Sequence, residues 1–251
     1  MKISIHSNVG KQRKSNQDYA DYFTNSFGQT FFVLCDGVGG QQAGDIASQA
    51  TTKYLGSRFE SLDQAIEIDQ ASEWIGQMIE AVNQYILDLS KQAEQYEGMG
   101  TTLVLALIID HTLFLAHVGD SRAYIFKDGD LIQMTEDHSL VNELIKSGEI
   151  TEAEGQTHPR RNVVTQSIGG TEEISYEITN LSLEQVDIVM LCSDGLTNML
   201  TKEVLVDFFN NQDHQSNLSH RLIDAANEAG GSDNITVIIV SDLDQGGEWN
   251  D

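Results

Sequence analysis

Proline, cysteine and basic residues are all scarce in this chain of 251 residues. A single proline and no Gly/Ser-rich run leave no visible linker, so we expect one domain over residues 1–251. The two cysteines, Cys35 and Cys192, each lie in an apolar segment, and a single disulfide between them could not stabilise a domain of this size. We therefore expect buried, reduced thiols, as in a cytoplasmic protein.

Long hydrophobic runs are also missing. The longest, residues 103–109, is far shorter than the roughly 18–20 residues of a membrane-spanning helix. The first residues lack the apolar stretch of a secretory signal. With 40% hydrophobic residues the chain can still bury a sizeable core, so the sequence predicts a soluble, cytoplasmic, folded protein.

Positive charge is the third shortage, because 14 Lys and Arg residues face 39 Asp and Glu residues and the formal net charge is −25. A surface of this sign repels nucleic-acid backbones and anionic lipids. We therefore expect neither nucleic acid nor membrane as a partner. Most of the carboxylates should be solvated surface groups.

Short apolar or alternating segments predict eight strands. These are residues 3–7, 29–35, 101–109, 112–118, 122–127, 131–134, 187–192 and 235–240. Connections as short as Asp110-His111 and 127–130 can join only antiparallel neighbours, and Asp128-Gly129 is typical of a hairpin turn. The middle of the chain therefore predicts an antiparallel meander.

Helical periodicity is strongest between residues 62 and 96. Further helices are expected at about residues 41–58, 139–146, 202–209 and 218–229. Thr151 and Glu154 have the spacing of a capping box. Helices before and after a run of antiparallel strands predict an α+β fold with helices outside the sheets.

Four aspartates stand where apolar strands end, and these are Asp36, Asp120, Asp194 and Asp233. An ionised carboxylate at the mouth of a core is costly unless it is paired or binds a cation, and basic partners are few. Oxygen-only ligands favour Mg²⁺ or Mn²⁺ over zinc. Gly37, directly after Asp36, has no side chain and would let its carbonyl approach a metal.

Other sites with a glycine-rich loop are excluded by their patterns. A dinucleotide-binding G-x-G-x-x-G would need glycine at position 42, which is Gln42. The phosphate-loop, EF-hand and H-E-x-x-H patterns are absent from the chain.

A basic cluster of Lys11, Arg13 and Lys14 lies near the N-terminus and fits either of two interpretations. It is a surface patch or, if it lies beside a metal, a partner for phosphate oxygens.

Eight motifs in order resemble those of the metal-dependent protein phosphatases, the type 2C Ser/Thr phosphatases, in their compact bacterial form. The motifs are RKSNQD (13–18), LCDGVGG (34–40), GMGTT (98–102), VGDSRAY (118–124), TEDHS (135–139), NVVTQSIGG (162–170), LCSDGLTN (191–198) and GGSDNITVIIV (230–240). The resemblance implies a four-layer α-β-β-α sandwich of two antiparallel sheets flanked by helices. It also implies a flap at about residues 144–161, beside a metal centre at one end of the sandwich.

The resemblance also assigns the metal ligands, taken position by position. Asp36 would bridge two Mn²⁺ or Mg²⁺ ions. Asp194 and Asp233 would complete the first site, and Asp18 and the carbonyl of Gly37 would serve the second.

Three further assignments concern a third ion, the phosphate and the acid. Asp120, together with Asp194, matches a third metal position. Arg13 matches the arginine that holds the substrate phosphate, and it is expected to act with Asp36 and Asp194 in catalysis. Family members that have a histidine in or after the Asp-Gly-x-Gly-Gly loop use it as a proposed general acid. Val38 and Gln41 occupy those positions here, so the general acid is unassigned.

The implied activity is hydrolysis of phosphoserine and phosphothreonine in proteins by direct attack of a hydroxide that bridges the metals. Expected partners are phosphorylated proteins and an opposing Ser/Thr kinase in bacterial signalling, and the chain is expected to act as a monomer. The competing hypothesis is a non-catalytic, metal-stabilised module that binds phosphoproteins. A nucleotide-binding enzyme is a more distant alternative.

Overall fold

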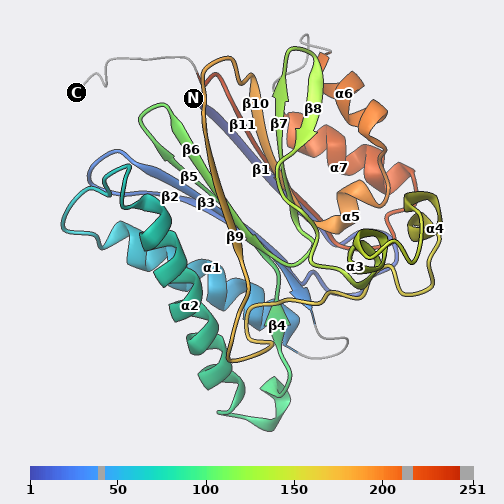
Figure 1. Cartoon of the computed structure of the whole chain (residues 1–251), viewed down its shortest axis with the longest axis horizontal. Helices are drawn as coiled ribbons and strands as arrows, with labels where there is room; N and C mark the ends of the chain where they lie inside the picture. The colour runs from blue at the N-terminus through green and yellow to red at the C-terminus, as the bar shows by residue number, and fades with distance from the viewer. Residues whose placement is uncertain (39–42, 211–216, 244–251) are drawn as a thin grey trace.

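A computed structural model describes residues 1–38, 43–210 and 217–243, and its strands form two antiparallel sheets that face each other (Figure 1). The first sheet has the order β1 (Lys2–Asn8), β11 (Ile235–Ser241), β10 (Ile188–Cys192), β7 (Arg122–Lys127) and β8 (Asp130–Gln133). The second sheet has the order β2 (Asp18–Thr24), β3 (Thr30–Val38), β5 (Leu103–Ile109), β6 (Thr112–Val118) and β9 (Glu177–Ser182). The short strand β4 (Gly100–Thr101) pairs with β3.

Helices cover the outer face of each sheet (Figure 1). The second sheet carries α1 (Gly44–Glu60) and α2 (Ala71–Ser90), which is followed by a 3₁₀ turn, η1 (Glu94–Tyr96). The first sheet carries α5 (Asp194–Thr197), α6 (Lys202–Asn210) and α7 (Leu218–Glu228). Two short helices, α3 (Leu140–Lys146) and α4 (Glu152–Gln156), lie at one end of the sandwich. The predicted α+β sandwich of four layers is confirmed.

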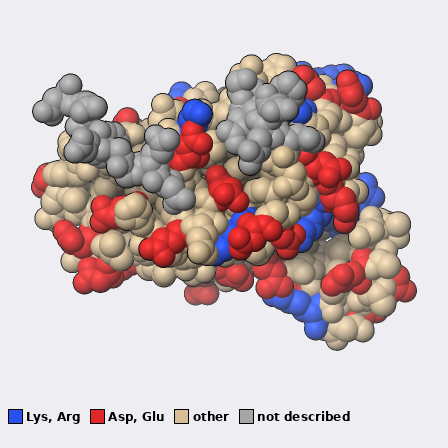
Figure 2. All heavy atoms as spheres, turned by 90° about the horizontal axis from the view of Figure 1, so that it is seen from above, with Lys and Arg blue, Asp and Glu red and all other residues tan. Residues whose placement is uncertain are grey.

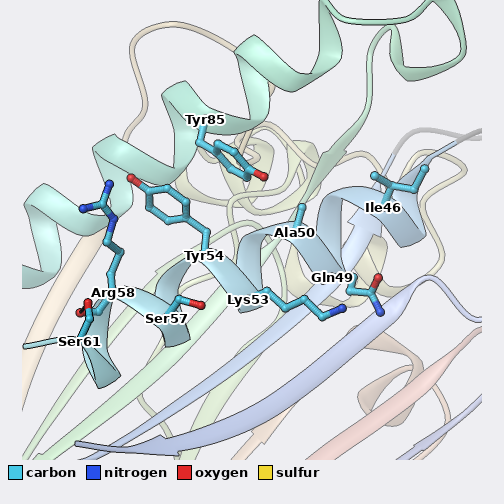
Figure 3. A pocket seen from close by; sticks show the side chains of 9 residues that line it. All are labelled: Ile46, Gln49, Ala50, Lys53, Tyr54, Ser57, Arg58, Ser61 and Tyr85. Carbon is cyan, nitrogen blue, oxygen red and sulfur yellow. Dashed lines mark hydrogen bonds between the residues drawn. The ribbon is translucent and has the colours of Figure 1, made fainter.

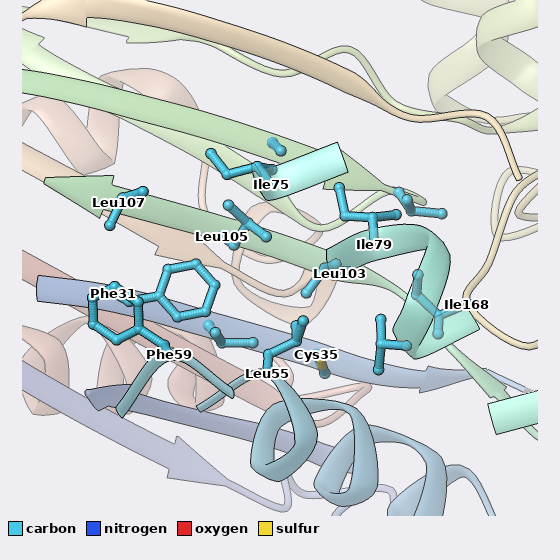
Figure 4. Close-up of a cluster of buried hydrophobic side chains, with 14 of the residues drawn as sticks. Phe31, Cys35, Leu55, Phe59, Ile75, Ile79, Leu103, Leu105, Leu107 and Ile168 are labelled. Carbon is cyan, nitrogen blue, oxygen red and sulfur yellow. The ribbon is translucent and has the colours of Figure 1, made fainter. Parts of the chain in front are cut away.

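The central strand β3 shows how the layers share the core. Phe31 and Val33 point toward α1 and α2, whereas Phe32 and Leu34 point into the space between the two sheets. Successive side chains alternate between the faces of a strand, and here both faces are buried. This is why the segment has an unbroken apolar sequence. Figure 4 shows Phe31 among the side chains packed between the second sheet and its helices.

Some local predictions were confirmed and others needed correction. Asp128 and Gly129 have positive φ angles of 53° and 78°, as a hairpin turn between β7 and β8 requires. Thr151 and Glu154 form the predicted capping box. The predicted helix over residues 62–96 is shorter, because α2 covers only residues 71–90. Residues 39–42 lie outside the described residues. They include Gln41, where the helix at about residues 41–58 is expected to begin.

The predicted meander is divided between the two sheets. Strands β6 and β7 do not pair with each other, because β6 pairs with β9 and β7 pairs with β10. The chain crosses from one sheet to the other at residues 119–121, which places Asp120 between them. The edge strands β2 and β9 were not predicted. They are only half-buried, and they lack the apolar run that marks the central strands.

The two cysteines are buried, as the sequence predicts. Cys35 and Cys192 are buried and free. No helix in the described ranges is long and apolar enough to cross a membrane.

Phe31 is a sensitive test of the outer core. Its ring contacts Phe59 at 5.1 Å between centroids and Trp74 edge-on at 5.7 Å, and none of its surface is exposed. Phe31→Ala should lower the free energy of unfolding by about 3–5 kcal/mol, because it leaves a cavity that these rings cannot fill. Urea denaturation measures this change. The matched control is Phe27→Ala in the β2–β3 turn, where Phe27 is 45% exposed and removal should have little effect. Equal losses in both variants would contradict the assigned core.

Candidate metal centre

The five aspartates singled out in the sequence lie at one end of the sandwich, where both sheets stop. Asp18 begins β2 and is the direct cross-strand partner of Asp36 in β3. Asp194 begins α5 immediately beyond β10, and Asp233 immediately precedes Asn234 and β11. Asp120 lies in the crossover between the sheets. Each sheet therefore contributes two carboxylates, and the crossover contributes the fifth.

Electrostatics show how close the five groups are. The pKa of Asp36 is raised well above its ordinary value, first by burial and then by the negative charges of Asp18, Asp194, Asp120 and Asp233. Asp36 is thus within electrostatic reach of all four others. Like charges gathered in this way oppose folding unless they are protonated or a cation offsets them.

Three of the neighbours are perturbed in the same direction. Burial raises the pKa of Asp18 to about 7, and the charge of Asp194 adds to the effect. Burial also raises the pKa of Asp120 to about 7, again with a contribution from Asp194. The pKa of Asp194 rises to about 6 through burial and the charge of Asp233. Several carboxyl groups with raised pKa values in one place are typical of a functional site.

Two carboxylate oxygens in this group are buried without a hydrogen-bond donor, Oδ1 of Asp18 and Oδ1 of Asp194. Such an oxygen normally finds a partner, because burying it without one is costly. A hard divalent cation would satisfy both oxygens, so the donor set fits Mg²⁺ or Mn²⁺. As the side chains now stand, no three His, Cys, Asp or Glu residues in the described ranges are arranged to hold an ion.

The backbone at Asp36 is fixed by two threonines. Thr102 donates its N–H to the carbonyl of Asp36 at 2.8 Å, and its Oγ1 accepts the N–H of Asp36 at 2.9 Å. Thr101 donates its Oγ1–H to the same carbonyl at 2.8 Å. At Gly37, a Cβ atom would lie 2.5 Å from the backbone of Gly44, so only glycine fits between β3 and the start of α1.

Ser193 connects the two sheets at the centre. Its Oγ–H donates to Oδ2 of Asp18 at 2.8 Å, and Oγ of Ser193 accepts the N–H of Thr236 at 3.0 Å. Ser193 is fully buried. It therefore holds Asp18 of the second sheet against β10 and β11 of the first. Glycine is again required two residues later, because a Cβ at Gly195 would lie 1.9 Å from the carbonyl oxygen of Asn234.

Asn234 fastens the loop that carries Arg13. Its Oδ1 accepts the N–H of Gln17 at 2.8 Å, and its Nδ2 donates to the carbonyls of Val9 and Ser15 at 2.9 and 3.0 Å. The side chain is 4% exposed, so these bonds are shielded from water. One side chain thus sets the position of residues 9–17 relative to Asp233.

Arg13 lies beside the carboxylates, in contact with Asp233. Its Nη2 donates to Oδ2 of Asp233 at 2.6 Å, and this bond is the main cause of the raised pKa of Arg13. Half of the Arg13 side chain remains exposed. The other cations of the predicted cluster, Lys11 and Lys14, are exposed and make no ion pair with a described residue. Arg13 is therefore the one member that reaches the aspartates.

The positioning residues were missed at the sequence level. Thr101, Thr102, Ser193 and Asn234 each lie within or next to a recognised motif, but only the aspartates, Arg13 and Gly37 received roles. A signal was available, because a short polar residue beside a buried carboxylate usually hydrogen-bonds to it or to its backbone. Of the two positions considered for a general acid, Val38 ends β3 with an aliphatic side chain, and Gln41 lies outside the described residues.

A large cavity opens directly from this centre. It has a volume of about 1140 Å³, and its lining includes Asp120 and Asp194. The other walls come from β7, β8, α3, α4 and α6. A protein segment could therefore lie in the cavity with one end at the aspartates.

A second hollow of about 730 Å³ runs along α1 beside Tyr85 of α2. Figure 3 shows side chains that line it, among them the stacked rings of Tyr54 and Tyr85, with Lys53 and Arg58 on α1. None of the five aspartates lines it. Over the face seen in Figure 2, acidic side chains are widely spread and basic ones form smaller groups, as the net charge of −25 predicts.

Known proteins share both the sequence and the fold. Residues 9–225 match the family described as Protein phosphatase 2C. Protein phosphatase PhpP of Streptococcus pneumoniae is 42% identical over 242 residues, which cover 96% of this chain and 97% of that protein.

Among solved structures, the serine/threonine phosphatase of S. agalactiae superposes with a TM-score of 0.90 at 39% identity, covering 95% of this chain and 98% of the other. Serine/threonine phosphatase Stp1 of Staphylococcus aureus superposes with a TM-score of 0.91 at 34% identity, covering 95% and 94% of the two chains. Sequence and fold agree over nearly the whole length. The chain belongs to the protein phosphatase 2C family.

Proposed function

We propose that this chain is a metal-dependent protein phosphatase that hydrolyses phosphoserine and phosphothreonine in proteins. The observation that carries the proposal is the gathering of five aspartates from both sheets at one end of the sandwich. Asp18, Asp36, Asp120 and Asp194 have raised pKa values there, and two buried oxygens lack a donor. Family membership and the named relatives support the same activity.

The proposed ligands are those that the resemblance assigns. Asp36 would serve two ions, with Asp194 and Asp233 on one side and with Asp18 and the Gly37 carbonyl on the other. Asp120, with Asp194, would serve a third ion. Bound Mn²⁺ or Mg²⁺ would supply the positive charge that activates water and offsets the charge of a phosphate group.

Arg13 is proposed to bind the phosphate of the substrate. Its guanidinium is half exposed and now pairs with Asp233. With Asp233 engaged as a metal ligand, the N–H groups of Arg13 would be free to donate to two phosphate oxygens, which is the geometry that favours arginine over lysine. Asn234 would keep this loop in place while Arg13 exchanges partners.

Protonation of the leaving oxygen is not assigned to a side chain. His138 is close to the crossover, but its Nδ1 accepts the N–H of Gly119 and its Nε2 lies 3.9 Å from Glu177 of β9. Both ring nitrogens therefore face the protein rather than the aspartates. Solvent in the open cavity remains as the proton source in this proposal.

The wider setting is proposed from the same resemblance. Residues 1–251 would form a single cytoplasmic phosphatase domain, acting as a monomer on phosphoproteins and opposing a Ser/Thr kinase. Residues 144–161, which include α4, would form a flap over the cavity. A purely binding role is less well supported, because such a module would not need to keep all five carboxylates at the centre.

Removing the central carboxylate tests the metal assignment. Asp36→Asn should lower kcat/KM for an aryl phosphate by more than about 100-fold. Mutating a residue that only hydrogen-bonds to a metal ligand commonly lowers metal affinity or activity by about 10–100-fold, and Asp36 is proposed to be a ligand itself. The same variant should lose the rise in melting temperature that Mn²⁺ gives to the wild-type protein. The matched control is Asp128→Asn, an exposed Asp-Gly in a hairpin turn. Full activity of Asp36→Asn would contradict the assignment.

Truncating Arg13 tests the phosphate-binding role. Arg13→Ala should raise KM for a phosphopeptide by about 10- to 100-fold with a smaller change in kcat, because a charge-assisted hydrogen bond contributes about 1.5–3 kcal/mol. Steady-state kinetics separate the two constants. Lys14→Ala, one residue away and equally exposed, removes the same charge and should leave KM nearly unchanged. A similar rise in KM in both variants would point to a general electrostatic effect instead.

The metal-free protein should become less stable as the pH rises. Well below about pH 4, the carboxyl groups of Asp18, Asp120 and Asp194 are protonated in the folded and the unfolded chain alike. Between about pH 4 and 7 the unfolded chain releases its protons first, because the folded pKa values of Asp18, Asp120 and Asp194 lie near 7, 7 and 6. Urea denaturation in EDTA should show this fall. Asp120→Asn should reduce it, and saturating Mn²⁺ should largely abolish it. A pH dependence that Mn²⁺ leaves unaltered would show that other groups cause the fall.

A further inference from the structure

Charged side chains line the 1140 Å³ cavity beside the aspartates. Some of them form ion pairs within the protein, and others do not. Seven carboxylates and three cations line it, the carboxylates being Asp120, Asp130, Glu136, Asp137, Glu152, Asp194 and Glu203, and the cations Arg122, Arg161 and Lys202. The charge that a ligand would meet depends on which of these are already paired within the protein.

Three of the wall carboxylates are neutralised by ion pairs. Asp137 accepts two hydrogen bonds from Arg122, at 2.6 and 2.8 Å. Asp130 pairs with Lys202 at 2.8 Å. Glu136 pairs with Lys146, which lies outside the cavity lining, also at 2.8 Å. These carboxylates are therefore unavailable to a ligand unless an internal pair breaks.

Two wall carboxylates, Glu152 and Glu203, make no ion pair with a described residue, and the nearest cation to act on Glu203 is Lys202, which already pairs with Asp130. Glu152 stands in the first turn of α4, where Glu154, two residues later, already accepts the N–H of Thr151 in the capping box. Glu203 stands in the first turn of α6, where its hydrogen bond to the Thr201 side chain keeps its pKa low and the group ionised. Both side chains are exposed. They come from different elements, so the cavity has an available negative charge on two walls.

The inner end of the cavity carries two of the proposed metal ligands. Asp120 lines it, is only 8% exposed, and accepts no side-chain hydrogen bond from another described residue. Oδ1 of Asp194, at the same end, is buried and unpartnered. Arg161 is the single lining cation of the described chain that has no ion pair. Apart from the proposed metal ligands, the charged lining residues without an ion pair to a described residue are therefore two carboxylates, Glu152 and Glu203, and one cation, Arg161.

We propose that this cavity binds the peptide segment flanking the phosphorylated residue, and that Glu152 and Glu203 select segments carrying lysine or arginine. The proposal rests on the proposed phosphatase function and specifies its substrate class. The phosphorylated residue lies at the aspartate end, and the basic flank lies between α4 and α6. Attraction of this kind contributes to specificity and to the rate of association more than to affinity.

The test compares two phosphothreonine peptides that differ only in the flank, one with arginines and one with alanines at the same positions. The wild-type protein with Mn²⁺ should have the higher kcat/KM on the arginine peptide. In the double variant Glu152→Gln/Glu203→Gln, the ratio of the two kcat/KM values should fall about 3- to 10-fold, as the loss of two exposed ion pairs implies. Raising the salt concentration should also lower the ratio of the two kcat/KM values for the wild-type protein, because salt screens exposed charges.

The matched control is Glu60→Gln/Glu97→Gln, which removes the same charge from exposed positions outside the cavity. It should leave the ratio unchanged. An equal fall in the control would overturn the proposal in favour of the general acidic field. A ratio that stays unchanged in the cavity variant would overturn it as well.

Two further measurements separate this proposal from the proposed function. Hydrolysis of an aryl phosphate, which has no flank, tests catalysis alone. Fluorescence anisotropy of the unphosphorylated arginine peptide at low salt tests the cavity alone. Weaker binding to the cavity variant than to the control variant supports the proposal even if no phosphate is hydrolysed. Equal binding to both variants overturns it even if the protein is an active phosphatase.

Discussion

The structure depends on holding like charges together at one end of two packed sheets. Asp18 and Asp36 are cross-strand partners in one sheet, and Asp194 and Asp233 extend from the other. An ionised carboxylate is more stable in water than in a buried site, and the raised pKa values of Asp18 and Asp36 record that cost. The apolar layers on both faces of each sheet supply the stability that offsets it. A cation is the natural complement to such a site, and it would couple metal binding to folding.

Uncharged side chains hold the acidic ones in place. Ser193 links Asp18 to the opposite sheet, Thr102 fixes the backbone of Asp36, and Asn234 fixes the loop of Arg13. All three are buried, so their hydrogen bonds act in a region of low dielectric where they are strong and directional. The same arrangement explains the glycines at 37 and 195, where backbones approach too closely for any side chain. Uncharged neighbours thus determine the positions of the proposed metal ligands.

The acidic side chains of the protein have two different roles. At the centre, five carboxylates point to metal ions. In the adjoining cavity, ion pairs neutralise Asp130, Glu136 and Asp137, and Glu152 and Glu203 are left to face a ligand. Scarcity of basic residues makes this division possible, because few cations are available to pair with the remaining acids. The cavity extends from the aspartates to both of these glutamates, so the charge available for substrate recognition adjoins the proposed site of hydrolysis.

The sequence by itself determined the central strands, the main helices and the family. Buried apolar runs and helical periodicity are local patterns, and eight ordered motifs identified the type 2C phosphatases. It also identified the aspartates, because a carboxylate that ends an apolar run is unusual wherever it occurs. The edge strands β2 and β9 escaped notice because half-buried strands lack that pattern. Only the tertiary structure decided that β6 and β7 belong to different sheets, that Asn234 reaches residues 9–17, and that Arg13 contacts Asp233. These contacts join residues far apart in the chain, and no local pattern encodes which of the possible partners the packed sheets bring together.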